Sequence, residues 1–121
     1  MTIRLCAQGD ILIERVEDGA VSGQVVESVH NGPVVIAEGE ATGHHHRLLG
    51  SVTMYRDDAI ARDIPSELYI AHVEVRSPTA RLVHEEHAPI TLEKGTYRVR
   101  RQRQLEPTDT GFNEGFGILR D

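Results

Sequence analysis

The chain has 121 residues, a formal net charge of −6 and a pI near 5.6. This length supports one domain with a single core, and the acidic balance argues against general affinity for nucleic acid or anionic lipid. Tryptophan is absent and aromatic residues make up only 4% of the chain. The core must therefore be built from Val, Ile, Leu and Ala, which suits a small β structure.

Short apolar runs with a two-residue period recur along the chain, separated by turn residues, and no long segment has a clean helical period. This pattern predicts an all-β protein, a small antiparallel β-barrel or jelly roll. We expect turns at 17–19, 31–33 and 93–95, a loop over 56–66, and a strand that ends at Ser77-Pro78. The expected strands are residues 10–16, 24–29, 34–37, 51–55, 67–75, 79–84, 89–92 and 96–104.

The expected organisation is one β-barrel domain over residues 1–111 and a Gly-rich C-terminal tail over residues 112–121. Apolar residues of the tail and the frequency of symmetric oligomers lead us to expect a homodimer. The sequence has neither the apolar run of a signal peptide nor a membrane span, so the expected protein is cytoplasmic with no membrane partner. The single cysteine, Cys6, excludes an intrachain disulfide and is interpreted as a small buried residue.

Two histidine clusters hold most of the seven histidines, Gly43-His44-His45-His46-Arg47 and His84-Glu85-Glu86-His87. Neutral imidazole is the commonest protein ligand for zinc and also binds iron and nickel, and carboxylates widen the range of metals. A divalent metal ion, with Fe, Zn, Ni or Mn as candidates, is therefore the leading cofactor hypothesis. His30 and His72 stand apart and are interpreted as a surface or a hydrogen-bonded core residue.

The first cluster can present two ligands together. Successive side chains of a strand point to opposite faces. If residues 42–49 form a strand, His44 and His46 share one face and can bind the same ion, whereas His45 points to the other face. A glycine-led His-x-His on a strand is uncommon without a metal, so we predict that His44 and His46 are ligands.

The second cluster leaves two alternatives open. On a continuous strand His84 and Glu86 share a face, which adds a third imidazole and a carboxylate to the set. If the strand breaks after His84, which Pro89 favours, His87 could turn inward and replace Glu86. The predicted metal ligands are His44, His46, His84 and Glu86, with His87 as the alternative to Glu86.

Further roles are assigned to the neighbours of these ligands. Glu86 or Glu85, where it is not a ligand, is the natural general base, and His45 or His87 a proton shuttle, so that Glu86 and His87 are the candidate catalytic residues. Arg47 could pair with a substrate carboxylate. Its alternative is an outward-facing strand charge.

Residues 39–46 and 89–97 resemble the two motifs of the cupins, small double-stranded β-helix barrels. The first stretch is similar to a glycine followed by a His-x-His pair, and the second to a Pro-x-Gly-like turn. The resemblance spans residues 34–104. It lacks the glutamate that follows the first motif, and Tyr97 stands where a third histidine is expected. His84 or His87 would then supply the missing ligand.

The resemblance implies a metal in the barrel mouth and a small-molecule ligand, with chemistry that ranges from oxygenation through isomerisation or lyase reactions to none. The expected function is a small metalloenzyme that acts on a polar or anionic molecule. The alternatives are a non-catalytic metal- or metabolite-binding barrel and an accessory interaction protein with a structural histidine cluster.

Residues 98–104 form a basic ribbon with arginines on both faces of the expected strand. Such a ribbon could bind phosphates. We favour a charged edge strand, or a partner for the many acidic residues, because no aromatic residues stand near it to stack on bases. Nucleic acid is therefore an unlikely partner.

Overall fold

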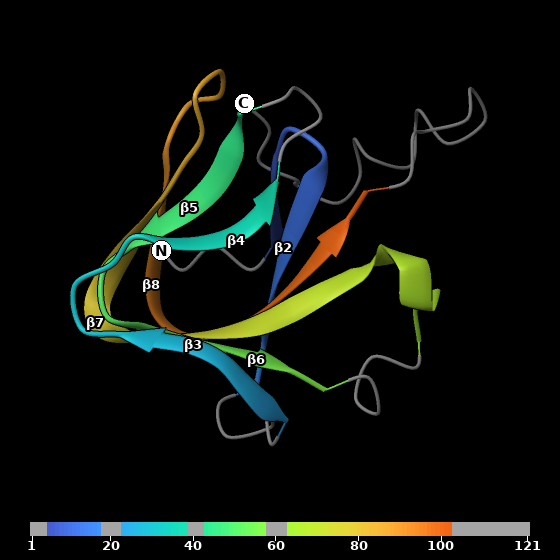
Figure 1. Cartoon of the computed structure of the whole chain (residues 1–121), viewed down its shortest axis with the longest axis horizontal. Coiled ribbons are helices and arrows are strands. Elements are labelled where there is room, and N and C mark those ends of the chain that lie inside the picture. Colours follow the sequence, from blue (N-terminus) through green and yellow to red (C-terminus); the bar gives the residue numbers. More distant parts are fainter. Residues whose placement is uncertain (1–4, 18–22, 39–42, 58–62, 103–121) are drawn as a thin grey trace.

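The computed structural model describes residues 5–17, 23–38, 43–57 and 63–102, and these are almost entirely antiparallel strand (Figure 1). The expected all-β, antiparallel class is confirmed. Among the described residues the helical element is a short 3-10 turn, η2 (Ser66–Leu68), which lies where the expected loop over 56–66 meets the expected strand over 67–75. The strands are β1 (Leu5–Gln8), β2 (Ile11–Val16), β3 (Gln24–Val29), β4 (Val34–Glu38), β5 (His45–Leu49), β6 (Val52–Arg56), β7 (Tyr69–Val83) and β8 (Ile90–Arg101).

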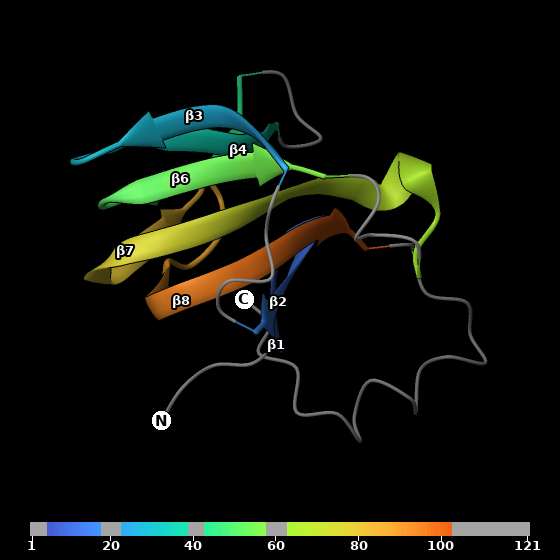
Figure 2. The same cartoon turned by 90° about the horizontal axis from the view of Figure 1, so that it is seen from below.

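One eight-stranded sheet contains all of these strands, and it branches at β7. On one side of β7 lies β8, followed by β2 and β1. On the other side, the first half of β7 pairs with β6 and the second half pairs with β5. The branches continue to β3 and β4, respectively, and they extend apart from β7 in Figure 1. Figure 2 shows β3, β6, β7 and β8 side by side in that order.

The core lies inside the curve of this sheet and consists of aliphatic side chains, as the composition predicts. Tyr97 is the largest fully buried side chain. Its hydroxyl donates to the Glu93 carbonyl at 2.6 Å and accepts from Arg15 Nη1 at 3.0 Å. The aliphatic members of the main cluster are Ile11, Ile13, Val34, Ile36, Ala37, Leu48, Val52, Val73, Val75, Ala80, Leu82, Ile90, Leu92 and Val99.

Two strands are longer than expected. The chain does not leave β7 at Ser77-Pro78, because the β7–β8 register shifts between Val75 and Thr79 and the proline falls inside this shift, where its missing N–H costs no ladder bond. The turn expected at residues 93–95 is also wrong. Gly95 is part of β8, and a Cβ there would lie 2.5 Å from Arg15 Nη2, so the glycine provides room for a guanidinium.

Pairing in the described part of the chain does not close the sheet, so the closed barrel expected from the sequence is not seen there. β1 was not expected, and Cys6 within it is fully buried, as predicted. The predicted tail, residues 112–121, and the end of the expected last strand lie outside the described residues. Across the described ranges, no helix is both long and apolar enough to cross a membrane.

Candidate metal centre

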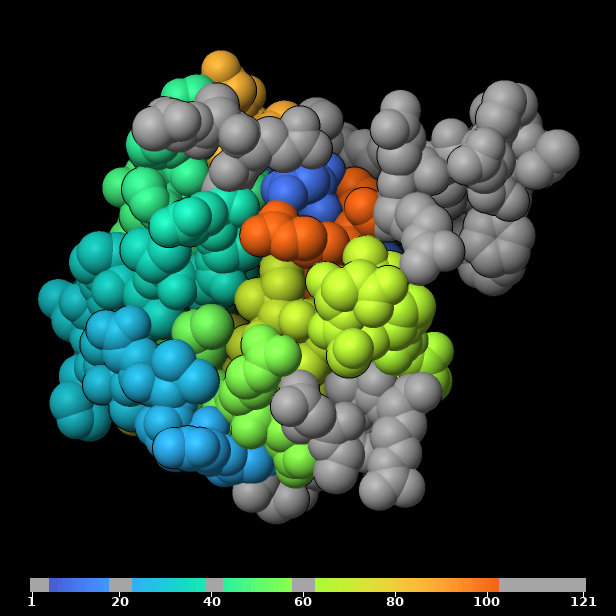
Figure 3. Space-filling model, turned by 45° about the vertical axis from the view of Figure 1, so that its right-hand side comes forward, coloured from blue at the N-terminus to red at the C-terminus, as the bar shows by residue number. Residues whose placement is uncertain are grey.

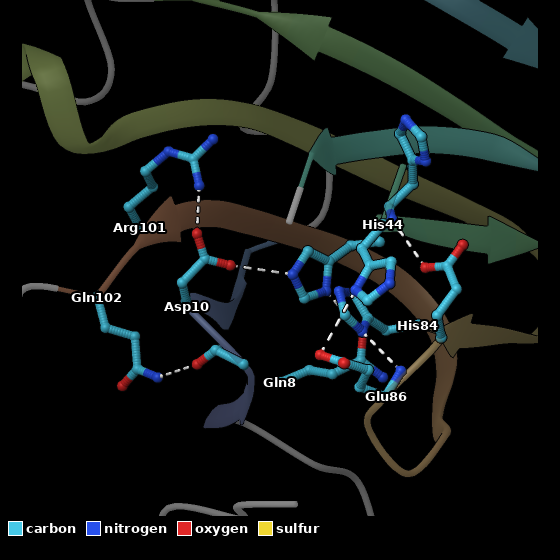
Figure 4. Close-up of polar contacts among 11 residues, drawn as sticks. Gln8, Asp10, His44, His84, Glu86, Arg101 and Gln102 are labelled. Atoms are coloured by element: carbon cyan, nitrogen blue, oxygen red, sulfur yellow. Dashed lines mark hydrogen bonds and ion pairs between the residues drawn. The ribbon is translucent and has the colours of Figure 1, made fainter. Parts of the chain in front are cut away.

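Three separate segments converge at one end of the sheet (Figure 4). They are the β1–β2 turn at Gly9-Asp10, the start of β5 with His44 to His46, and the β7–β8 connection that carries His84 and His87. Strand pairing brings them together: Arg47 of β5 is opposite Val83 of β7, and Ile11 of β2 is opposite Arg101 of β8. Residues far apart in the sequence therefore share one polar site.

His46 is the centre of this site and is fully buried. Its Nδ1 lies 2.9 Å from Gln8 Oε1, and its Nε2 lies 3.0 Å from Asp10 Oδ1. Burial lowers the pKa of His46 below its ordinary value of 6.5, and the hydrogen bond that the protonated ring would donate to Asp10 only partly opposes this effect. The neutral imidazole, the form that binds metals, is therefore favoured.

Two further imidazoles pack beside His46. The ring centroid of His84 lies 4.4 Å from that of His46 and 4.7 Å from that of His87. The rings of His46 and His87 are stacked at 6.5 Å. A methyl group on Gly9 would lie 2.7 Å from His87 Nε2 and 3.3 Å from His46 Cε1, so both rings close over this glycine.

His44 and Glu86 form the more accessible side of the site. His44 Nδ1 lies 3.4 Å from Glu86 Oε2, and the His44 ring meets that of His84 edge to face at 5.6 Å. The backbone N–H of Glu86 donates to His84 Nδ1 at 3.1 Å. The four predicted ligands are thus brought into one neighbourhood, and His87 joins them because β7 ends at Val83, before the second cluster.

Glu85 and Arg47 fasten the β7–β8 connection to β5. Glu85 accepts the backbone N–H of His45 at 2.8 Å and Arg47 Nη2 at 3.3 Å. The backbone hydrogen bond from His45, together with the Arg47 charge, lowers the pKa of Glu85 to about 2. The structure therefore places Arg47, the predicted substrate-binding residue, in an ion pair beside the histidines.

Sequence reasoning missed Gln8 and Asp10. Both flank Gly9, whose φ of 59° marks a tight turn, and the signal for them was two polar side chains on either side of a turn glycine. Asp10 Oδ2 pairs with Arg101. Gln102 secures the same turn, because its backbone N–H donates to the Asp10 carbonyl and its Nε2 to the Gly9 carbonyl, each at 2.8 Å.

The side chains converge as a hydrogen-bonded cluster. Within residues 5–17, 23–38, 43–57 and 63–102, no three His, Cys, Asp or Glu side chains are arranged so that they could hold a metal ion as they stand. His46 already faces a polar partner at each ring nitrogen, and His84 Nδ1 accepts a backbone N–H. Ion binding would require rotation of side chains in the β7–β8 connection.

The basic ribbon has a structural role. Its strand, β8, lies between β2 and β7, so the expected edge position is wrong. The alternative role, as a partner for acidic residues, is confirmed: Arg98, 9% exposed, pairs with Glu14 and Asp63. Nearby, His72 is buried and its Nδ1 lies 2.8 Å from the Tyr69 hydroxyl, as expected of a hydrogen-bonded core histidine.

One protein family, described as a domain of unknown function (DUF8820), matches the chain over residues 7–102. The matched range includes every residue of the site, from Gln8 to Gln102. No curated protein and no solved structure matches the chain. Since the match covers most of its length, the chain belongs to the DUF8820 family.

Proposed function

We propose that this DUF8820 protein binds one divalent metal ion through the imidazoles of His46, His84 and His87. The supporting observation is the spacing of the rings. A metal–nitrogen bond of about 2.0–2.1 Å, with the ring centre roughly 1 Å farther out, puts the centroids of two imidazoles on one ion about 4.5–5 Å apart. The centroid distances of 4.4 Å and 4.7 Å, from His84 to His46 and His87, are close to this spacing. The 6.5 Å between His46 and His87 is longer, so the His87 side chain would have to rotate toward His46 when the ion binds.

The surroundings of His46 also support the proposal. Ligand histidines in metalloproteins are oriented by a hydrogen bond at the other ring nitrogen. Here Gln8 occupies Nδ1, while Nε2 faces the Asp10 carboxylate. Asp10 adds an oxygen donor that mixed nitrogen and oxygen sites for Fe, Mn, Ni or Zn use. His44 and Glu86 are near enough to complete the ligand set from the accessible side.

We further propose that the accessible side serves a small polar or anionic molecule. Glu86 is 63% exposed there and is the candidate acid–base residue, whereas His87 is better assigned to the ligand set. A bound ion would polarise or activate such a molecule. Arg47 and Arg101 stand on either side of the cluster and, although each is paired with a carboxylate, bring positive charge to it. Inorganic phosphate or oxalate should perturb the visible spectrum of the Co²⁺-loaded protein.

We propose a cupin-like relationship as the evolutionary setting of this site. The antiparallel sheet favours it, as does the placement of His44 just before β5 and of His46 within it. The third histidine then comes from the β7–β8 connection, because Tyr97 is buried in the core with its hydroxyl fully engaged. In a double-stranded β-helix, the antiparallel strand pairs follow the same order in both halves of the barrel. A crystal structure whose strands do not follow this order would reject the relationship.

The decisive experiment is metal titration of untagged, chelator-stripped protein with Zn²⁺, read by calorimetry and elemental analysis. We expect one ion per chain. The double variant His84→Ala/His87→Ala should lose stoichiometric binding, because it removes two of the three proposed imidazoles from an accessible connection without opening the core. Circular dichroism checks that its β structure persists.

A matched control removes the same number of histidines elsewhere. His30 is exposed. The hydrogen bond of His45 to the cluster comes from its backbone N–H, which donates to Glu85 and is kept when the side chain is removed. The variant His30→Ala/His45→Ala should bind Zn²⁺ as the wild type does. The metal site would be rejected if both double variants lost Zn²⁺ binding to the same extent, or if the wild type did not bind Zn²⁺ stoichiometrically.

A second candidate function is a purely structural histidine cluster. The observation that favours it is the set of hydrogen bonds that His46 and His84 already make. In that case metal-free His84→Ala/His87→Ala should unfold at a lower urea concentration than the wild type. Zn²⁺ should not raise the urea concentration at which half of the wild-type protein is unfolded. For a metal site, Zn²⁺ should raise the wild-type midpoint and leave that of the variant unchanged.

A further inference from the structure

Gln8 is a fully buried amide in β1 whose hydrogen bonds determine how it is oriented. Its Nε2 donates to the Leu82 carbonyl at 3.1 Å and to the Ala88 carbonyl at 3.0 Å. A flipped amide would turn its own carbonyl oxygen toward these two acceptors and lose both bonds. Oε1 must therefore face His46.

This orientation selects one tautomer of His46. Gln8 Oε1 can only accept, and it lies 2.9 Å from His46 Nδ1, so Nδ1 must carry the hydrogen. In the neutral ring, Nε2 is then the nitrogen with the lone pair. It points toward Asp10 Oδ1, 3.0 Å away, so the two lone pairs face each other, and the Asp10 carboxylate would have to turn aside for an ion to bind Nε2.

The same amide holds the second histidine cluster. Leu82 and Ala88 bracket the segment that carries His84 and His87, and both of their carbonyls bind Gln8 Nε2. One side chain of β1 thus ties together the two ends of the connection and the buried histidine of β5. On the exposed side of the connection, Glu85 reaches His45 and Arg47, and Glu86 reaches His44.

We propose that Gln8 is the positioning residue of the metal centre: it forces His46 to coordinate through Nε2 and holds His84 and His87 within reach of the same ion. The proposal rests on the proposed metal-binding function. Gln8 does not touch the ion and acts through His46 and the β7–β8 connection. The tautomer that Gln8 imposes on His46 is also present in the metal-free protein, where it can be tested separately.

The first test is long-range proton–nitrogen NMR of the His46 ring in metal-free wild-type protein at pH 8. We expect a protonated Nδ1 and an unprotonated Nε2. A hydrogen on Nε2, alone or together with Nδ1, would overturn the assignment of Gln8. This measurement needs no variant and no bound ion, so its outcome is independent of the proposed function.

The second test compares Gln8→Met with Thr53→Val by titration with Co²⁺ alone. Methionine matches glutamine in length but makes none of its hydrogen bonds. Thr53 is also buried, at 6% exposed, and its hydroxyl lies 2.9 Å from that of Ser28 in the β3–β6 branch, so its variant loses a hydrogen bond away from the histidines. Circular dichroism establishes that both variants are folded.

We expect Gln8→Met to weaken Co²⁺ binding by about 10- to 100-fold, the range found when partners of metal ligands are removed, and to change the visible spectrum. Thr53→Val should match the wild type in affinity and spectrum. If Gln8→Met has unchanged Co²⁺ affinity and spectrum, the positioning role of Gln8 is rejected, but the proposed metal site is not. Absence of stoichiometric Co²⁺ binding in the wild type would instead reject the proposed function. If Gln8→Met does not fold, the NMR assignment decides.

Discussion

At the scale of single residues, Gly9 and Gly43 provide a natural comparison next to the histidines. Both have positive φ, 59° and 82°, which favours glycine. They differ in their surroundings. A Cβ at Gly9 would lie 2.7 Å from His87 Nε2, whereas a Cβ at Gly43 would meet nothing within 4 Å. An alanine at Gly43 therefore tests backbone strain alone, whereas an alanine at Gly9 tests backbone strain together with crowding of His87.

We predict that Gly43→Ala lowers the free energy of unfolding by about 1–2 kcal/mol, the cost of a left-handed conformation for alanine, and that Gly9→Ala lowers it further because its Cβ also displaces His87. Only Gly9→Ala should displace His87 and shift its ring resonances. Urea unfolding measures the first effect and NMR of the histidine rings the second. If Gly43→Ala disturbs the His87 resonances as strongly as Gly9→Ala, the close packing of His87 on Gly9 is wrong.

At the scale of the elements, β7 organises the sheet. It pairs with β8 along most of its length and with β6 and β5 on its other side. By contrast, the described residues give β3 one partner strand, β6, and its Val25 and Val26 are 52% and 57% exposed. This outer strand is visible on the surface in Figure 3. Strands with few buried apolar contacts open locally at low free energy.

We predict that amide hydrogen exchange is slowest in the middle of β7 and β8 and much faster in β3. The reason is that exchange from β3 requires only separation from β6, whereas exchange from β7 requires loss of the core around Val73 and Leu82. Exchange followed by NMR at neutral pH tests this order. Equal protection of β3 and β8 would show that β3 has a further covering contact.

At the scale of the whole molecule, buried ionisable groups determine how stability varies with pH. Burial lowers the pKa of both His46 and His72 below 6.5, and Arg98 lowers that of His72 further. Hydrogen bonds lower the pKa of Glu85 from 4.5 to about 2, and Arg98 lowers that of Asp63 from 3.8. The unfolded chain takes up protons before the folded protein in both ranges.

Stability of the metal-free protein should therefore decrease in two steps as the pH falls. The first begins below about 6.5, where the unfolded histidines become protonated while His46 and His72 stay neutral in the fold. The second begins below about 4.5, as Glu85 and Asp63 lose the ionised form that their partners stabilise. Urea unfolding between pH 8 and 3 measures both. The variant His72→Gln should have a shallower first step, and an unchanged slope there would contradict the lowered pKa of His72.

The sequence by itself determined the all-β class, the aliphatic core and most strand positions, because a two-residue apolar period and turn residues are local signals. It also identified both histidine clusters as belonging to one site. It placed the ends of β7 and β8 wrongly, since a proline at a register shift and a glycine under Arg15 look like turn residues until their neighbours are known.

Only the tertiary structure decided which side chains surround the histidines. Gln8 and Asp10 reach His46 because β1, β2, β5, β7 and β8 pair in a particular register, and this pairing depends on contacts between distant segments. The end of β7 at Val83 likewise brings His87 beside His84, while Glu86 lies at His44, so the choice between Glu86 and His87 as a metal ligand stays a prediction. Local periodicity carries no information about such partners. Pairing of the strands around a common core brings these distant residues to one place.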